Sequence, residues 1–369
     1  ASDLRAMGLS SAPGRALPVA QIAQVDFSGT TAGSRHTPSD WFAIEHGHLL
    51  DALRSSIESE HVAFMPGATV HGFLWAEDGV CGVQCEGGTT YPAEVVVLAD
   101  ESSPRLAEQL GLRPDWSPSE LMHVGKRRYA ADPTVVRDRL GAGADGYEVI
   151  SFVQSASWGS PGWGVVIPGP DSITIAVAMS LEEAMVSTRH ISEYLDEIER
   201  QPPVRDRIAG LSLESSMTEV VPTGGFDSRN TFHTDGVVVV NDLVGVTHPL
   251  NRDGLSSNLA VCHAAARTIA NAVASNDYSK KSLGQFSKSI VDHVISPVDA
   301  ARRKDKALRA RPRWMWASKA DLFPTGRGVT AGPKPATLYG MSDSGVWHRL
   351  RGFGRIPGVR RHAPGEYDE

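Results

Sequence analysis

The sequence predicts a mixed α/β fold (α+β) in which a parallel-sheet unit is combined with a separate antiparallel sheet. Val237 to Val240 are consecutive β-branched residues, which is typical of a parallel strand buried on both faces. An apolar pattern with helical period follows them, whereas the middle of the chain consists of short β-rich segments separated by Gly, Pro and Asp. Since the chain has 369 residues, of which 41% are hydrophobic, it can bury a large core.

Segment 236–274 reads as a strand, a loop and a helix. Asp242 lies just past the carboxyl end of the strand, the position at which open α/β sheets bind ligands. A helix that begins near Ser256 would point unpaired amide groups into the loop, which suits an anionic or electron-rich group. The loop is shaped by Gly245, Pro249 and Gly254. The apolar face of the helix is expected to consist of Leu259, Cys262, Ala266, Ile269 and Val273. This layout predicts a Rossmann-like dinucleotide pocket.

The same segment resembles that of the FixC-like flavoproteins, relatives of electron-transfer-flavoprotein:quinone oxidoreductase and, more distantly, of the geranylgeranyl reductases. In that family it reads roughly GDAAG, then a Pro, then a Gly before a helix, and its Asp binds the ribityl chain of FAD. The spacing from Asp242 through Gly245, Pro249 and Gly254 fits this pattern. The resemblance therefore implies an FAD cofactor bound by these residues, with the helix start up to Asn258 near the pyrimidine edge of the flavin.

Three further stretches resemble the family in the same order along the chain. Ile44 to Gly72 looks like the helix and following strand that lie beside the FAD. Ala93 to Ser103 looks like the strand that ends in A-D-G, which implies that Asp100 borders the cofactor. Leu213 to Gly225, with its Val-Pro and glycines, looks like the crossing strand. Together the matches imply the family's fold over most of the chain.

The sequence also departs from the family pattern at positions that contact FAD. His46 stands where the family carries an Arg that reaches the FAD phosphates. Glu101 replaces the Gly of A-D-G, and its carboxylate beside Asp100 would repel a pyrophosphate. Asn241 replaces the first Gly of the GDAAG segment. The G-x-G-x-x-G strand–turn–helix unit is not found in residues 1–40. The cofactor pocket is therefore predicted to be degenerate.

Two interpretations follow from these departures. In one, the protein is a FixC-like oxidoreductase component with an eroded FAD pocket that acts as a subunit with a catalytic flavoprotein partner. In the other, it is a complete FAD-dependent oxidoreductase for electron or hydride transfer, whose glycine-rich unit is missing from this chain or supplied by another chain. Erosion at several independent positions favours the first. In either case His248, between Asp242 and Gly254, is the candidate acid or base, although a loop histidine satisfied by local backbone is an equal alternative.

Three parts are predicted along the chain. Residues 1–120 and 213–282 form the discontinuous, N-terminally incomplete FAD-binding unit, residues 121–212 an antiparallel-sheet substrate domain, and residues 283–369 C-terminal helices and a tail. The strands expected in the substrate domain are His123–Ala131, Tyr147–Gln154, Gly162–Ile167 and Ser172–Met179, followed by a helix within Ser187–Gln201. Trp158 and Trp163 could line a pocket there, although packing aromatics are more common.

Composition and motifs restrict the remaining functions. The formal net charge of −7 argues against a general nucleic-acid binder, and no run approaches the ~18 apolar residues of a membrane span. The three cysteines give no iron–sulfur or zinc pattern and suit a reducing cytoplasm, and His46 and His48 are two apart on a helix, so no metal site is predicted. The basic segment after Pro297 and the arginine-rich tail are either solvated surfaces or docking faces for an acidic electron carrier or an anionic membrane. A small-molecule substrate is expected, but its class is not readable.

Overall fold

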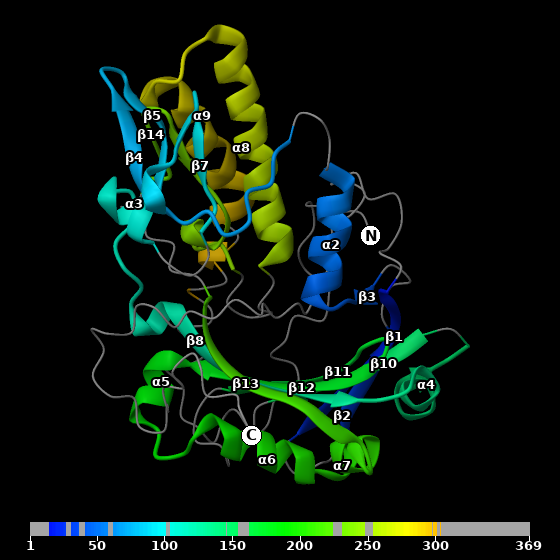
Figure 1. The fold of residues 1–369 in the computed structure, drawn as a ribbon. Helices are drawn as coiled ribbons and strands as arrows, with labels where there is room; N and C mark the ends of the chain where they lie inside the picture. Colours follow the sequence, from blue (N-terminus) through cyan, green and yellow to red (C-terminus); the bar gives the residue numbers. More distant parts are fainter. Residues whose placement is uncertain are drawn as a thin grey trace.

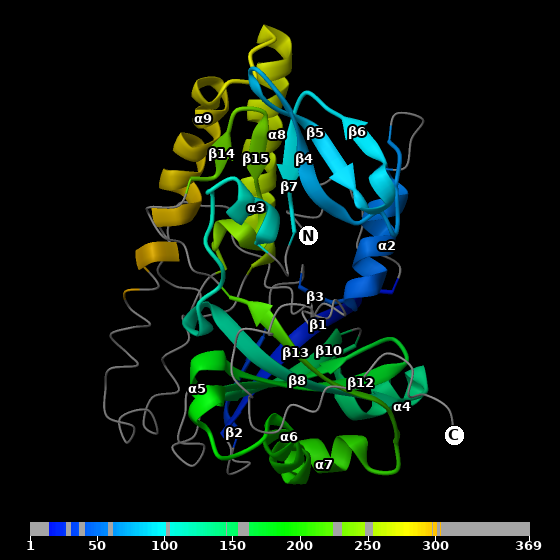
Figure 2. The ribbon, with the colours of Figure 1, turned by 60° about the vertical axis from the view of Figure 1, so that its left-hand side comes forward.

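The computed structural model describes residues 15–26, 31–36, 41–57, 62–100, 104–144, 146–153, 162–223, 231–247, 254–296, 298–300 and 303. The described chain forms a lower lobe, built on a strongly curved sheet with helices beneath it, and an upper lobe with small sheets and long helices (Figure 1). A view from the side shows the two lobes stacked, with helix α2 (His46–Ile57) standing between them (Figure 2). The predicted mixed α/β fold is confirmed.

The lower lobe contains one large sheet, nine-stranded among the described residues, with the order β13-β8-β12-β11-β10-β1-β2. Strand β3 pairs with β1, and β9 pairs with β10. The pairs are antiparallel except for β1 and β10, which run parallel. The strands are β1 (Leu17–Asp26), β2 (Thr31–His36), β3 (Phe42–Ala43), β8 (Leu121–Ala130), β9 (Gly141–Ala142), β10 (Gly146–Val153), β11 (Gly162–Pro168), β12 (Ser172–Ser180) and β13 (Ser212–Pro222). The four strands expected between residues 123 and 179 are therefore present, within a few residues of their expected bounds.

Helices cover the lower face of this sheet. They are α4 (Pro133–Leu140), α5 (Leu181–Val186), α6 (Ile191–Arg200) and α7 (Pro202–Ile208). Helix α6 packs closely on the sheet because the facing residue of β8 is Gly125. A Cβ at Gly125 would be 2.9 Å from Ile191 Cγ1 and 3.0 Å from Leu195 Cδ1. Odd-numbered positions of β8 thus face the helices. The even-numbered ones face the upper lobe, because side chains alternate along a strand.

Three strands of the large sheet come from stretches predicted for the cofactor unit. Residues 17–36 contribute β1 and β2, and residues 213–222 contribute most of β13. The physical reason is that β1 extends the sheet by parallel pairing with β10, and β13 pairs along the whole of β8. The sequence of a strand shows how apolar and polar residues alternate along it, but not which strand pairs with it. This pairing could therefore not be predicted from the segments themselves. The division into domains stays a prediction.

The upper lobe is organised around β15 (Val237–Val239), which lies between β14 (His233–Thr234) and β7 (Val96–Leu98). Strand β15 runs parallel to β7, and its valines are at most 1% exposed, as predicted for a strand buried on both faces. A second small sheet consists of β4 (Val70–Ala76), β5 (Gly79–Cys85) and β6 (Thr90–Pro92). The helices are α3 (Arg105–Gln109), α8 (Leu255–Ser275) and α9 (Lys280–Ile290), with short helical turns at Glu86–Gly88, Pro118–Glu120 and Asn241–Val244.

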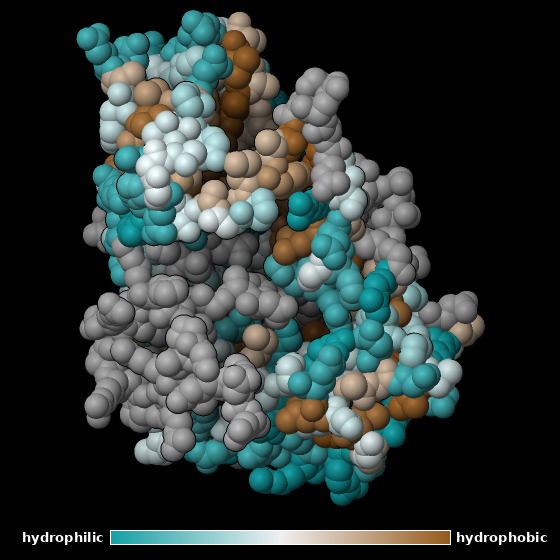
Figure 3. Space-filling model, in the orientation of Figure 1, coloured by the Kyte–Doolittle hydropathy of each residue, from teal (hydrophilic) through white to brown (hydrophobic). Residues whose placement is uncertain are grey.

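Helix α8 buries a different face from the predicted one. The residues packed on the core are Val261, Ala265, Thr268 and Ala272. On the predicted face, by contrast, Cys262 is exposed and Val273 is 52% exposed, and an apolar strip is visible along α8 at the molecular surface (Figure 3). The two sets of apolar residues have the same period and are offset by one position, about 100° around the helix, so periodicity alone cannot decide which one meets the sheet.

Towards the C-terminus, α9 continues into a π-helical turn at Val291–Ile295. Several predicted features lie outside the described residues, namely Pro297, most of the basic segment that follows it, the aromatic residues beyond, the arginine-rich tail, Glu101 and Trp158. In the described part of the chain, no helix combines the length and apolar character that crossing a bilayer requires.

One buried histidine makes folding stability sensitive to acid. Burial lowers the pKa of His123 on β8 to about 4, and the nearby His190 adds to the effect. The unfolded chain keeps a histidine pKa near 6.5, so protons bind the unfolded state first as the pH falls. Above about pH 6.5 the histidine is neutral in both states and costs no stability. As the pH falls from 6.5 to 4, the free energy of unfolding decreases by about 3 kcal/mol because the unfolded chain binds the proton more readily.

We expect urea unfolding at pH 7.5 and 4.5 to show this loss, and His123→Gln to reduce the difference between the two pH values. The exposed His263 on α8 provides the matched control, because His263→Gln should leave the difference unchanged. An unaltered pH dependence in His123→Gln would contradict the assignment.

Candidate functional site

The candidate site lies at the carboxyl ends of the parallel strands β7 and β15. Val97 pairs with Val238 and Leu98 with Val239. The Val240 amide then donates to the Leu98 carbonyl at 2.8 Å, so the two strands end together. Asp100 follows β7 and Asp242 follows β15, and both leave the sheet at the same edge. This is the edge at which open α/β sheets bind their ligands.

The backbone after β15 turns sharply. Asn241 has φ 62°, in the left-handed region, and Gly245 at the end of the helical turn Asn241–Val244 has φ 76°. Asparagine tolerates this conformation better than other residues that carry a Cβ, since its short polar side chain bonds locally. Asn241 therefore fits the turn that the family's glycine would make, and its presence is compatible with the pocket backbone.

The Asp242 carboxylate is fixed by two side chains. Its Oδ1 accepts a hydrogen bond from Asn258 Nδ2 at 2.8 Å and one from Thr247 Oγ1 at 3.4 Å. Thr247 packs against the start of α8 so tightly that a Cβ at Gly254 would lie 3.1 Å from Thr247 Oγ1. The glycine allows the helix to begin close to Asp242, and the carboxylate is held in one orientation.

The first turn of α8 adds hydrogen-bond donors to this site. The helix begins at Leu255 with Gly254 as its N-cap, and no side chain caps it. The first amide groups of a helix have no intrahelical acceptor and carry the positive end of the helix dipole. The site thus offers a fixed carboxylate, which accepts from hydroxyl groups, beside amide donors that suit a carbonyl or anionic oxygen.

Helix α2 brings His46 to the same region. Leu255 packs in the apolar cluster of Ile44 and Leu49, so the start of α2 lies beside the start of α8 (Figure 1). His46 is the first residue of α2 and is half-buried, and His48 Nδ1 lies 3.7 Å from Glu45 Oε2. The described residues contain no group of three or more His, Cys, Asp or Glu side chains that could hold a metal ion.

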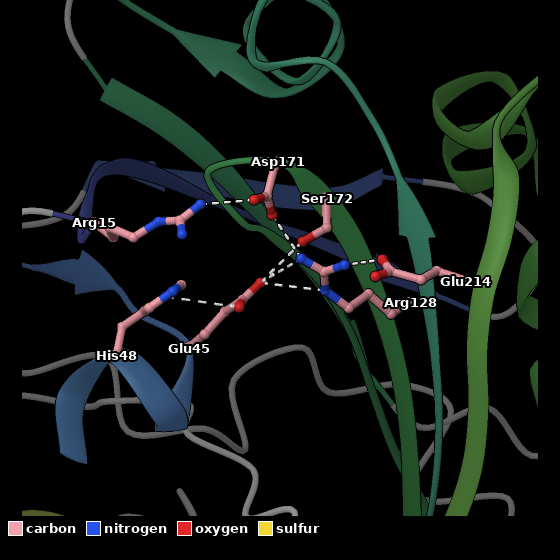
Figure 4. Close-up of polar contacts among 7 residues, drawn as sticks. All are labelled: Arg15, Glu45, His48, Arg128, Asp171, Ser172 and Glu214. Carbon is pink, nitrogen blue, oxygen red and sulfur yellow. Dashed lines mark hydrogen bonds and ion pairs between the residues drawn. The ribbon is translucent and has the colours of Figure 1, made fainter. Parts of the chain in front are cut away.

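An ion network fastens the start of α2 to the large sheet (Figure 4). Arg128 on β8 lies with Nη2 2.6 Å from Asp171 Oδ1 and 3.3 Å from Glu45 Oε1, and its Nη1 bonds to Glu214. Ser172 Oγ donates to Glu45 Oε1 at 3.0 Å. These residues come from separate segments, so no local sequence signal could have revealed the network. It fixes the orientation of α2, and with it His46.

The face of the large sheet that is turned toward the upper lobe is mainly apolar. Met122, Val124 and Ala178 form its buried cluster, with Trp163 packed against them. Glu219 pairs in register with Val124 and therefore shares this face, where it is 4% exposed. Trp163, which could line a pocket or pack in the core, packs against the buried cluster of this face and is itself only partly buried.

The fold is that of FAD-dependent oxidoreductase structures. A geranylgeranyl bacteriochlorophyll reductase-like protein from Thermoplasma acidophilum matches with a TM-score of 0.64 at 14% identity, over 86% of this chain and 78% of that one. PqsL, a probable FAD-dependent monooxygenase from Pseudomonas aeruginosa, matches with a TM-score of 0.59 at 16% identity, over 85% of each chain. The flavin-dependent brominase Bmp2 matches with a TM-score of 0.60 at 15% identity, over 84% and 80%. At these identities the likeness concerns the fold.

Comparison with curated protein sequences gives relatives of higher sequence identity than these structures. The chain is 27% identical to YdiS of Escherichia coli K12, named "Probable electron transfer flavoprotein-quinone oxidoreductase", over 71% of this chain and 61% of that protein. It is 25% identical to FixC of the same organism, over 63% and 55%. No family model matches. The resemblance to FixC and the quinone oxidoreductases is thus confirmed, while the match spans less than two thirds of the relatives' length.

The structure brings together four of the residues selected from sequence, namely Asp242, Gly245, Gly254 and Asn258. Asp100 lies at the same sheet edge, and His46 stands on the adjacent helix. His248 and Pro249 lie outside the described residues. Sequence reasoning missed Thr247, whose hydroxyl reaches Asp242, although its place in the loop between Gly245 and Gly254 was a signal. The binding roles of all these residues remain predictions.

We expect Arg128→Met to lower the free energy of unfolding by about 1–3 kcal/mol, because Glu45 and Asp171 lose a partly buried cation. Urea unfolding measures the change, and hydrogen exchange of the Leu49 amide, which donates to the Glu45 carbonyl at 3.1 Å, should accelerate. Arg205→Met is the matched control: its pair with Asp206 is 61% and 67% exposed, so the effect should stay within about 0.5 kcal/mol. Equal effects in the two variants would contradict an anchoring role.

A second prediction concerns the left-handed turn. Asn241→Ala should destabilise the protein by about 1–2 kcal/mol, because a Cβ without a local hydrogen-bonding group is strained there. Asn241→Gly should stay within about 0.5 kcal/mol of the parent. Asn271→Ala, within helix α8, should be neutral or slightly stabilising. The same value for Asn241→Ala and Asn271→Ala in thermal unfolding would show that the turn stores no strain.

Proposed function

We propose that this protein is an FAD-binding oxidoreductase component of the FixC type that passes electrons between a small-molecule donor and a protein electron carrier. One observation carries the proposal: the Asp242 carboxylate is fixed by Asn258 at the start of α8, on the carboxyl edge of a parallel strand pair. This donor set fits FAD, since a carboxylate accepts from ribityl hydroxyl groups and a helix N-terminus suits a flavin carbonyl oxygen.

Each element of the site has a distinct role in this proposal. Asp242 binds the ribityl chain, with Gly245 and Gly254 keeping the backbone close, and the α8 start up to Asn258 lies at the pyrimidine edge. His46, at the start of α2, contacts the phosphates of FAD. Asp100, which follows the neighbouring strand β7, borders the cofactor. FAD, when bound, supplies the electron or hydride chemistry. The apolar sheet face around Val124 and Trp163 excludes water from the substrate side.

We further propose His248 as the group that holds or moves a proton near the substrate, because it belongs to the loop between Asp242 and Gly254, and Pro249 as a residue that shapes this loop. The description of YdiS as a probable electron transfer flavoprotein-quinone oxidoreductase supports an electron-carrier protein as the partner. The matched region covers only part of those proteins, so activity and partner rest on this similarity.

A second candidate function is a subunit with an eroded pocket that acts with a catalytic flavoprotein. The observations in its favour are Glu101, which adds a carboxylate beside Asp100 in the sequence, and histidine rather than arginine at the start of α2. The conformation of Asn241 weakens this alternative, since its backbone adopts the left-handed region that a glycine would also allow there. Flavin content of the isolated protein separates the two, because the second candidate predicts none.

The proposal predicts that Asp242→Ala weakens FAD binding by about 10- to 100-fold, the loss expected when hydrogen bonds to a charged group are removed. Titration of the protein with FAD, followed by flavin fluorescence, gives the affinity. Asp277→Ala, at the opposite end of α8, serves as the matched control and should bind FAD like the parent. Equal affinities for Asp242→Ala and the parent would refute the assignment of Asp242.

A further inference from the structure

Arg113 is a buried cation that connects two segments far apart in the sequence. It follows α3 in the loop that leads to the turn Pro118–Glu120, and its residue is only 3% exposed. Arginine is rarely buried to this extent unless its charge is matched. Its contacts reach a segment 130 residues away in the sequence, the turn that carries Asp242.

Contacts with Leu243, Glu120 and Trp116 hold the guanidinium group. Nη1 donates to the Leu243 carbonyl at 3.1 Å. Nη2 lies 3.4 Å from Glu120 Oε1, and the guanidinium carbon stacks 3.7 Å from the centre of the Trp116 ring. The contacts with Trp116 and Glu120 orient the planar guanidinium group, so that its Nη1 points at the Leu243 carbonyl.

Leu243 directly follows Asp242 within a sharp turn. Asn241 at the start of this turn is left-handed, a conformation that a residue with a Cβ keeps only where the surrounding structure holds it, and the left-handed Gly245 ends the turn. On one side, Asn258 and Thr247 hold the Asp242 carboxylate. On the other side, Arg113 holds the next carbonyl from within the core. The chain is thereby held at the Asp242 side chain and at the Leu243 carbonyl.

We propose that Arg113 is a positioning residue for the ligand-binding carboxylate: it anchors the Leu243 carbonyl and so sets the orientation of Asp242 for FAD. This role rests on the proposed function of Asp242. Its bond to the Leu243 carbonyl lets Arg113 act through the backbone of the turn.

The first measurement needs no cofactor. The Gly245 amide donates to the Asp242 carbonyl at 2.8 Å and so reports opening of the turn, whereas the Val239 amide, bonded to the Phe232 carbonyl at 2.8 Å, reports opening of the core. Arg113→Met keeps an apolar stem and removes the cation. It should accelerate hydrogen exchange at Gly245 by about tenfold, the weight of one hydrogen bond to a charged group, and leave Val239 unchanged.

Two further variants keep this test decisive. Arg113→Lys retains the charge without the fork and should give a smaller acceleration, and it carries the test if Arg113→Met also loses protection at Val239. Glu120→Gln removes the charge of the pair but keeps an oxygen acceptor for Nη2, so Arg113 stays oriented toward Leu243 and Gly245 exchange should be unchanged even if stability falls. Unchanged Gly245 exchange in both arginine variants, or equal acceleration in Glu120→Gln, would overturn the proposal.

The second measurement is a double-mutant cycle on FAD affinity. Arg113→Met should weaken FAD binding about tenfold in the parent and by less than about twofold in the Asp242→Ala background, because a residue that acts through Asp242 has no effect once Asp242 is gone. Additive effects would identify Arg113 as a general stabilising residue and overturn the positioning role. Failure of the proposed function has a different signature: Asp242→Ala would leave FAD affinity unchanged while Arg113→Met still accelerates exchange at Gly245.

Discussion

The parallel pairing of β7 with β15 is the constraint on which the candidate site depends. Both strands are short and end together, so the residues that follow them, Asp100 and Asp242, emerge at one edge of the upper lobe. The valines of β15 are buried and leave the strand no freedom to shift register without exposing them. The turn after β15 therefore starts from a fixed point, and its left-handed residues place Asp242 at the N-terminus of α8.

Two arginines connect this edge to the rest of the molecule. Arg113 ties the turn after β15 to the loop behind α3, and Arg128 ties the start of α2 to the large sheet. Both use a planar, permanently charged group to hold segments that lie far apart in sequence, a task for which the guanidinium fork is suited. The site is thus assembled from loops and helix starts, while the orientation of each comes from contacts with the sheets behind them.

Sequence reasoning recovered the parts of this arrangement that depend on local pattern. The run Val237 to Val240 predicted the buried parallel strand, and short β-rich segments separated by Gly, Pro and Asp predicted the central strands of the large sheet. The glycines around Asp242 predicted the turn and the helix start. Features that depend on tertiary partners were not recovered. The two apolar stripes of α8 are indistinguishable by period, and the neighbour of β1 is not encoded in its own residues. The conformation of Asn241, read from sequence as a defect, became interpretable only with its φ angle.

The central claim is that the edge formed by β7, β15 and the start of α8 binds FAD. The most direct test is a native mass spectrum of gently purified protein, recorded before and after incubation with FAD, because it reads the chain, any bound small molecule and any companion chain together. We predict a species whose mass exceeds that of the chain by one FAD. A spectrum that shows only the cofactor-free chain after incubation would contradict the claim.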